Sequence, residues 1–340
     1  MAACNHRRLY NSTMQTLRTL CLLLALALAS ALYSQGKILR ADPAINQIVP
    51  PNAVIEKLAS GFGFTEGPVW LRDGSVLFSD IPNNAIQKWT PDGKVTLFRK
   101  PSGYDRTEAP PGAFIGSNGL TLDKQGRLII CEHGNGRVTR LEKDGKLTVL
   151  AARYQGKRLN SPNDAVHKSD GSLYFTDPPY GFVKQDEDPK KELKFNGIYR
   201  LAGGKLQLLS TELTRPNGLG FSPDEKYLYV ANSDAARKIW MRFEVKPDGT
   251  LAPGKVFFDV TARTEDGLPD GLKLDQTGNL YGTGPGGVWI ISPEGKHLGA
   301  IQPPETPANC AWGEADGKTL YITARTGFYR IRLLIPGIRP

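Results

Sequence analysis

One short pattern occurs six times along the chain, at intervals of roughly 50 residues. Each copy has a turn, usually containing Gly or an acidic residue, followed by a short run of apolar and β-forming residues. The six runs are 76–78, 128–130, 173–175, 227–230, 279–281 and 319–322. A turn followed by such a run is typical of β-hairpins. The chain must therefore fold as a set of similar β units.

The number of strands in each unit indicates the architecture. A further hairpin follows in most repeats, as at 86–93, 138–145 and 198–204, which gives about four strands per repeat. The sequence lacks the amphipathic segments of 10–15 residues that would connect parallel strands. Six repeats of four strands predict an all-β fold, a six-bladed β-propeller with about four antiparallel strands per blade.

The two ends of the repeat array suggest how the ring closes. The last repeat ends near 328–333 and is one strand short, whereas an unassigned strand-like run, 53–58, precedes the first repeat. Because a repeat array must close or cap its ends, we predict that this N-terminal run completes the last blade and closes the ring. The predicted organisation is a signal peptide over 1–31, a linker over 32–52 and one propeller domain over 53–335.

The first 31 residues have the pattern of a secretory signal peptide. Arg7 and Arg8 precede an unbroken apolar run, 20–29, and residues 29–31 fit a small-x-small cleavage site. The run is shorter than the ~20 apolar residues that a membrane span needs. We therefore expect a secreted or periplasmic protein with no membrane contact after cleavage. An uncleaved N-terminal anchor is the alternative.

Charge and cysteine content exclude two other classes of protein. The net charge of +9 is spread over interleaved basic and acidic residues, which indicates a solvated surface and no nucleic-acid partner. Beyond the signal peptide, Cys131 and Cys310 are the remaining cysteines, too few for a disulfide framework. They fall in the second and sixth repeats, which are not neighbours in a six-blade ring, so we expect buried free thiols.

A polar residue lies at the start of the inner strand of every repeat. We call these six residues the anchors: Glu66, Asn118, Asn163, Asn217, Asp270 and Asn309. Because the innermost strands of a propeller line its central channel, the anchors should converge there. Carboxylate and amide oxygens suit a hard cation such as Ca²⁺, and the sequence has no His/Cys cluster with zinc spacing. The alternative is that these Asn-Gly and Asp-Gly pairs only form turns.

Several further residues are candidates for work at the channel mouth. His133 follows the inner strand of the second repeat and is either a general base or a surface or structural histidine. Asp177 has the comparable position in the third repeat, where it would bind substrate, hold a second ion or brace a loop; Asp80 and Ser233 have weaker cases. Insertions at 104–114 and 183–195 should shape specificity, with Arg106 and Tyr180 as candidate substrate contacts.

The segments around the anchors resemble the gluconolactonase/regucalcin (senescence-marker protein) family of six-bladed propellers. The resemblance extends from about 62 to 329, and 131–135 is similar to the bacterial secreted branch. The segments that carry it are 64–70, 116–121, 160–166, 174–181, 215–219, 268–272 and 308–311. It implies one divalent cation, usually Ca²⁺, with Zn²⁺, Mn²⁺ or Mg²⁺ as other options. The implied ligands are Glu66, Asn163, Asn217 and Asp270, with Asn163 the least secure because it sometimes binds through water. Asn118 and Asn309 would then contact substrate or support the channel.

The reaction that the resemblance implies is lactone hydrolysis, with a sugar lactone such as gluconolactone as the expected substrate and partner. A cation on the lactone carbonyl would polarise it, and a carboxylate or histidine would activate water. The resemblance favours Asp270 as the base, although a cation-bound carboxylate is a weaker base, and His133 is the rival. The alternatives are phosphotriester or aryl-ester hydrolysis at the same site, and a non-catalytic, calcium-stabilised binding propeller. We expect a monomer.

Overall fold

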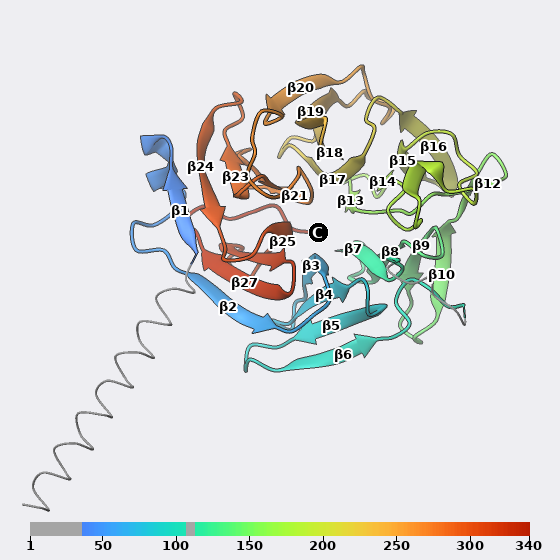
Figure 1. Cartoon of the computed structure of the whole chain (residues 1–340), viewed down its shortest axis with the longest axis horizontal. Helices are drawn as coiled ribbons and strands as arrows, with labels where there is room; N and C mark the ends of the chain where they lie inside the picture. Colours follow the sequence, from blue (N-terminus) through green and yellow to red (C-terminus); the bar gives the residue numbers. More distant parts are fainter. Residues whose placement is uncertain (1–35, 107–112) are drawn as a thin grey trace, which may run out of the picture.

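The computed structural model describes residues 36–106 and 113–340, and the predicted signal peptide lies outside them. Six antiparallel sheets are arranged around a central axis as the blades of a propeller (Figure 1), which confirms the predicted fold class. No helix in these two ranges is long and apolar enough to cross a membrane.

The first three blades follow the chain from the inner strand to the outer strand. Blade 1 contains β3 (Thr65–Trp70), β4 (Val76–Asp80), β5 (Ala85–Trp89) and β6 (Val95–Arg99). Blade 2 contains β7 (Ser117–Leu122), β8 (Leu128–Glu132), β9 (Arg137–Leu141) and β10 (Leu147–Ala151). A small hairpin, β11 (Arg153–Tyr154) and β12 (Lys157–Arg158), precedes blade 3. Blade 3 contains β13 (Ala165–His167), β14 (Leu173–Asp177), β15 (Gly197–Ala202) and β16 (Lys205–Ser210), with a 3₁₀ turn η2 (Gln185–Glu187) in its long insertion.

The last three blades repeat the arrangement, and two of them add strands from the N-terminal side. Blade 4 contains β17 (Pro216–Phe221), β18 (Tyr227–Asp234), β19 (Arg237–Glu244) and β20 (Lys255–Asp259). Blade 5 contains β21 (Leu272–Leu274), β22 (Leu280–Gly284), β23 (Gly287–Ile291), β24 (His297–Gln302) and, outermost, β1 (Lys37–Arg40). Blade 6 contains β25 (Pro307–Gly313), β26 (Thr319–Ala324), β27 (Gly327–Arg332) and, outermost, β2 (Ile55–Ser60).

The N-terminal segment therefore belongs to the two last blades. The strand expected at 53–58 is β2, which pairs antiparallel with β27. Most of the segment interpreted as a linker is packed structure: β1 pairs with β24, and a 3₁₀ turn η1 (Pro43–Gln47) follows it. Ile45 and Val49 are fully buried in the core between blades 5 and 6. Pro43 is compatible with this turn, because it takes the first position, where a backbone N–H is not needed.

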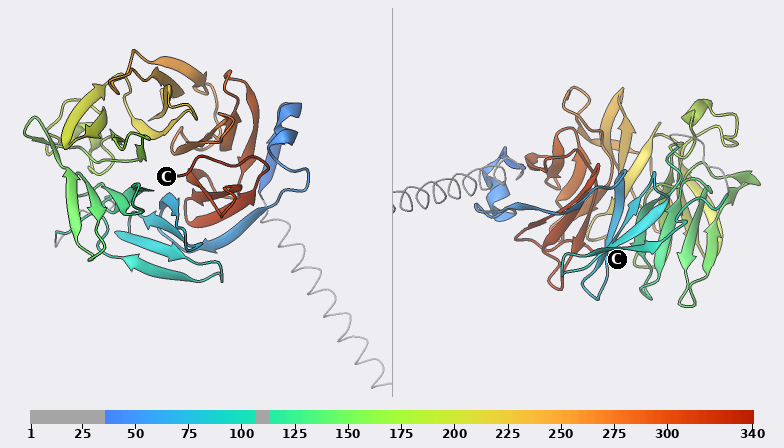
Figure 2. Two further views of the ribbon diagram at one scale, coloured as in Figure 1. Left: turned by 180° about the vertical axis from the view of Figure 1, so that it is seen from behind. Right: turned by 60° about the horizontal axis from the view of Figure 1, so that its bottom comes forward.

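The hydrophobic core lies between adjacent blades. The second strand of a blade is buried on both faces, as in β4, β8 and β14, which explains the continuous apolar runs in the sequence. The outer strand β6 has no fully buried residue: its three central residues are exposed and its two end residues are half-buried. Cys131 and Cys310 are both buried free thiols, as expected, and belong to different inter-blade clusters. The blades therefore hold the inner strands in a fixed ring, seen from behind and from the side in Figure 2.

Candidate active site

Local irregularities in the inner strands direct the anchors into the channel. The pairing of the inner strand with the second strand changes register at Glu66, around Asn118, around Asn217 and at Asn309. The remaining anchors, Asn163 and Asp270, come just before their inner strands begin. Such bulges redirect a side chain and leave backbone groups free for other partners.

The residue after most anchors is glycine because neighbouring inner strands approach closely. A Cβ on Gly67, which has φ +50°, would lie 2.1 Å from the carbonyl oxygen of Asn118. A Cβ on Gly218 would lie 2.4 Å from the carbonyl oxygen of Asp270. No side chain fits at either position, so each glycine allows one anchor to pack against the next. The anchor-glycine pairs in the sequence thus serve channel geometry as well as turn formation.

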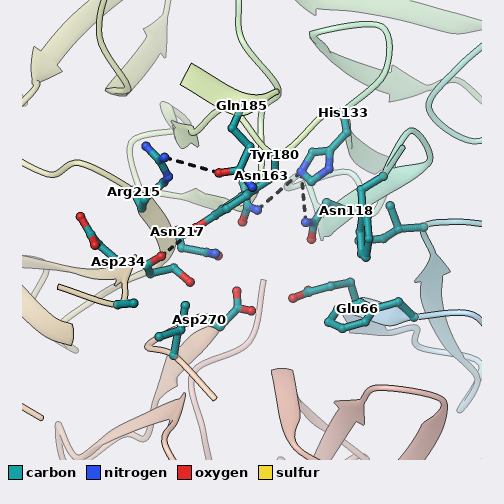
Figure 3. Close-up of a pocket in the computed structure, with 16 residues that line it drawn as sticks. Glu66, Asn118, His133, Asn163, Tyr180, Gln185, Arg215, Asn217, Asp234 and Asp270 are labelled. Carbon is teal, nitrogen blue, oxygen red and sulfur yellow. Dashed lines mark hydrogen bonds between the residues drawn. The ribbon is translucent and has the colours of Figure 1, made fainter. Parts of the chain in front are cut away.

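Five of the six anchors, all except Asn309, meet at the base of a cavity of about 480 Å³ (Figure 3). Seven of the predicted site residues line this cavity: Glu66, Asn118, His133, Asn163, Tyr180, Asn217 and Asp270. Arg106 and Asp177 do not line it. The structure therefore brings the four implied cation ligands together, and it adds His133 and Tyr180 at their upper side.

Four buried side-chain oxygens at this base have no hydrogen-bond partner. They are the Oδ1 atoms of Asn118, Asn163, Asn217 and Asp270. The amide nitrogens of Asn118 and Asn163 both face Nε2 of His133, at 3.1 Å and 3.5 Å. This arrangement turns both amide oxygens away from the imidazole. Buried polar atoms without a partner are rare, and a group of them on one cavity indicates a ligand that they are built to hold.

The two carboxylates at the base are buried close enough to affect each other. Burial raises the pKa of Glu66 to about 7, with the Asp164 carboxylate adding to the rise. Burial, together with the negative charges of Glu66 and Asp164, raises the pKa of Asp270 well above its ordinary value. Charged carboxylates gathered in a buried site are costly unless a cation compensates them. The electrostatics therefore fit a divalent cation.

The anchors differ in whether their side-chain oxygens are available to bind a cation. No three His, Cys, Asp or Glu side chains within residues 36–106 and 113–340 are arranged to hold a metal ion, so a cation would depend on amide oxygens beside Glu66 and Asp270. Asn309 is not available for this purpose, because its Oδ1 accepts the backbone N–H of Cys310 and its Nδ2 donates to Glu66 (2.9 Å). Oxygen donors of mixed charge are those that Ca²⁺ prefers. Asn309 is a support for Glu66.

His133 is placed at the cavity but is a weak base. It is 1% exposed, and burial lowers its pKa to about 4, so the ring is neutral at neutral pH. With Asn118 Nδ2 donating to it, Nε2 acts as an acceptor. A neutral imidazole in this setting orients the two amides, and it is near enough to the cavity to accept a proton from a bound group.

Asp177 and Arg106, both candidates for substrate contact, have surroundings outside the cavity. Asp177 Oδ2 accepts the backbone N–H of Asn160 (2.8 Å) and braces the loop before β13. Asp80, at the comparable position of the first repeat, likewise accepts a backbone N–H, that of Gly63 (3.0 Å). Arg106 lies on a separate groove, with its guanidinium 5.8 Å from the centre of the Tyr104 ring.

Sequence reasoning missed a charged pair at the base of the channel. Asp164 is 2% exposed, and its Oδ2 lies 3.5 Å from Nζ of Lys273. Asn309 Nδ2 is 3.4 Å from the same oxygen. A signal was available, because Asp164 occupies the position after the anchor where four other repeats have glycine. A carboxylate in place of a glycine that faces the channel should have indicated a buried charge.

A polar group at the cavity rim was also missed. Gln185, Arg215 and Asp234 line the cavity beside Tyr180, whose hydroxyl donates to the carbonyl of Ser233 (2.9 Å). Ser233, a weaker candidate, thus lines the cavity as well. Gln185 comes from the 183–195 insertion, which was expected to shape specificity without a particular residue being named. Its position depends on how the insertion folds, which the repeat pattern does not determine.

The blades and the channel together define a class: a six-bladed propeller with an oxygen-donor site at one end of its central channel. Residues 64–326 match the SMP-30/gluconolactonase/LRE-like region. The chain belongs to this family, which confirms the resemblance seen in the sequence.

Relatives with assigned names support this placement. The gluconolactonase of Zymomonas mobilis is 40% identical over 312 residues, which cover 87% of this chain and 86% of the relative. The 6-deoxy-6-sulfogluconolactonase of Pseudomonas putida is 27% identical over 274 residues, 76% of this chain and 82% of the relative. A solved gluconolactonase structure from Xanthomonas campestris aligns with a TM-score of 0.76 at 33% identity, covering 88% of this chain and 95% of that one.

Proposed function

We propose that this protein is a lactonase that depends on a divalent cation, with calcium as the first candidate and a neutral sugar lactone such as gluconolactone as substrate. The observation that carries the proposal is the group of four unpartnered oxygens beside Glu66 in one cavity. The similarity to the Zymomonas gluconolactonase supports lactones as the substrate class.

The residues suggest a division of roles. Glu66, Asn163, Asn217 and Asp270 would hold the cation. When bound, the cation supplies Lewis-acid polarisation of the lactone carbonyl. Asn118 Oδ1 is free to accept a hydrogen bond from substrate or water.

Hydrolysis also needs a proton acceptor near the attacking water. Attack forms a C–O bond from water to the carbonyl carbon, and the ring C–O bond then breaks with proton transfer to the departing oxygen. Asp270 is the first choice for carrying the proton, because its Oδ1 has no other partner. His133 is the second choice, since its low pKa makes it neutral but weakly basic.

The test is hydrolysis of glucono-1,5-lactone, followed by acid release above the spontaneous rate, with added Ca²⁺ and with a chelator. We expect cation-dependent turnover that Asp270→Asn reduces by about 100-fold or more. Asp266→Asn is the matched control, because that carboxylate is 67% exposed on the same loop. Turnover that survives both the chelator and Asp270→Asn would contradict the proposal. Aryl esters and a phosphotriester, assayed in parallel, test the alternative substrates.

We also propose that the protein is exported and that cleavage follows residue 31. Support comes from the basic residues, the apolar run and the small residues described above. Mass spectrometry of protein recovered from the periplasm or medium should give an N-terminus at residue 32. Full-length protein in the membrane fraction would indicate an uncleaved anchor.

A further inference from the structure

The two sides of the cavity differ in chemistry. Blades 1 and 2 and the segment between them supply Phe64, Ile81 and Phe114, and the two aromatic rings meet edge to face at 5.4 Å. On the side of blades 3 and 4 (Figure 3), four polar residues line the cavity near Tyr180, namely Gln185, Arg215, Ser233 and Asp234, together with the small side chain of Ala235. Apolar rings suit the C–H face of a sugar, and the polar wall suits its hydroxyl groups.

The polar wall is built around one guanidinium. Arg215 contacts Asp186, donates to the Thr214 carbonyl (3.1 Å) and lies 3.4 Å from Oε1 of Gln185. Gln185 has a φ of +47°, a left-handed backbone conformation that is uncommon for a residue other than glycine. Strained backbone of this kind is found where a fixed side-chain position is needed.

Two carboxylates accompany this guanidinium. Asp186 pairs with it directly, and Asp234 accepts the Thr214 hydroxyl beside it (2.5 Å). The Thr214 hydroxyl, with a further contribution from Arg215, holds the pKa of Asp234 below its ordinary value, so Asp234 is charged at neutral pH. Arg215 is the one Lys or Arg among the described residues that line the cavity, whereas Glu66, Asp234 and Asp270 are acidic.

The wall therefore offers hydrogen bonds without offering positive charge. Arg215 supplies donors, Asp234 supplies acceptors and Gln185 can supply both, which together match hydroxyl groups that donate and accept. A phosphate or sulfonate at the same place would meet two carboxylates and an already paired arginine. An anion there would lose hydration without gaining a free cationic partner.

We propose that Gln185, Arg215 and Asp234 form a specificity wall that selects neutral, hydroxyl-rich lactones and rejects lactones with an anionic exocyclic group. This inference rests on the proposed lactonase function. It predicts that this protein differs in substrate preference from the Pseudomonas relative, whose name refers to a lactone that carries a sulfonate.

The experiment compares kcat/KM for glucono-1,5-lactone and its 6-phosphate in the cation-loaded enzyme. The wild type should favour the neutral lactone. Asp234→Asn keeps the shape of the side chain and removes one charge, so it should lower that preference about threefold to tenfold by improving the phosphorylated substrate. Arg215→Gln should weaken the neutral lactone about tenfold, chiefly through KM. Asp248→Asn, an exposed turn residue of blade 4, is the matched charge control and should leave the preference unchanged.

The outcomes separate the two levels of the proposal. Turnover of the neutral lactone with an unchanged preference in Asp234→Asn would overturn the specificity wall and leave the lactonase intact. A wild type that favours the phosphorylated lactone would do the same. Absence of turnover on either lactone with Ca²⁺ present would overturn the lactonase function and this inference with it.

Discussion

The two ends of the central channel are formed by the same inner strands, but one end is suited to bind a ligand and the other stabilises the fold. At the upper end, before β21, Asp270 is half-buried, and its Oδ1 is a buried atom that has no partner. At the lower end, directly after β21, Asp275 is fully buried and accepts five hydrogen bonds from Thr277, Asn279 and Tyr281. Asp270 therefore has an oxygen available for a ligand, whereas the oxygens of Asp275 are used by hydrogen bonds within the fold. The comparison teaches that unsatisfied buried polarity, and not burial alone, locates the site.

The lower end is closed by the last residues of the chain, which lie near the axis in Figure 1. Ile338 N–H donates to the Leu274 carbonyl and Gly337 N–H to the Gly317 carbonyl, both at 2.9 Å. The guanidinium of Arg339 lies 5.3 Å from the Trp70 ring centre. Trp70 and Leu274 end their inner strands, opposite the anchors. The cavity therefore opens at the upper end, where the ligand must enter.

The largest expected effect is at the upper end. Asn217→Leu removes an amide oxygen that has no protein partner, so the metal-free free energy of unfolding should change by about 1 kcal/mol or less. Activity and cation affinity should each fall by about 100-fold or more. Steady-state kinetics, calcium titration and urea denaturation measure the three quantities. A variant that unfolds readily but keeps its cation affinity would show that Asn217 is structural.

The opposite result is expected for Asp275→Ala at the lower end. Removing an acceptor of five hydrogen bonds leaves buried donors unpaired, which should cost about 3–4 kcal/mol of stability. Lactone hydrolysis by the folded protein should change less than about twofold. Urea denaturation followed by an assay well below the transition checks both. If Asp275→Ala lost activity but kept the stability of the wild type, the two ends of the channel would be coupled, and their separate roles would be contradicted.

The pair between Asp164 and Lys273 lies between the two ends and should have an intermediate effect. Lys273→Met leaves Asp164 buried without a cation, but Lys273 is 22% exposed, so solvent reduces the cost to about 2 kcal/mol. Asp164→Asn in the same chain should recover at least half of that loss. If the double variant is less stable than the single one, the pair does not act as a counter-ion pair.

The sequence predicted the upper end better than the lower end for a physical reason. The anchors repeat in register, so the symmetry of the propeller alone places Glu66 and Asp270 at one axis. The lower closure is made once, by residues 335–340 that match no repeat. Gln185 and Asp164 were missed because each departs from the pattern, one in an insertion and the other at a glycine position. For Asp177 the sequence left substrate binding, a second ion and loop bracing open, because the repeat pattern does not say which groups surround an acid; its hydrogen bond from the Asn160 N–H fits loop bracing.

The smallest effect on activity is expected where the tail meets the lower end. A Cβ on Gly337 would lie 1.9 Å from the Trp312 ring, so Gly337→Ala must lift the tail and lose its three backbone hydrogen bonds. Because the tail groups can bond to water once the tail moves into solvent, the cost should be only about 1–3 kcal/mol, measured by urea denaturation, with lactone hydrolysis unchanged. Truncation after Ile335 should cost a similar amount if the tail acts only as a cover. A much larger loss in the alanine variant would mean that Trp312 itself is displaced, and that the lower end supports the inner strands on which the anchors depend.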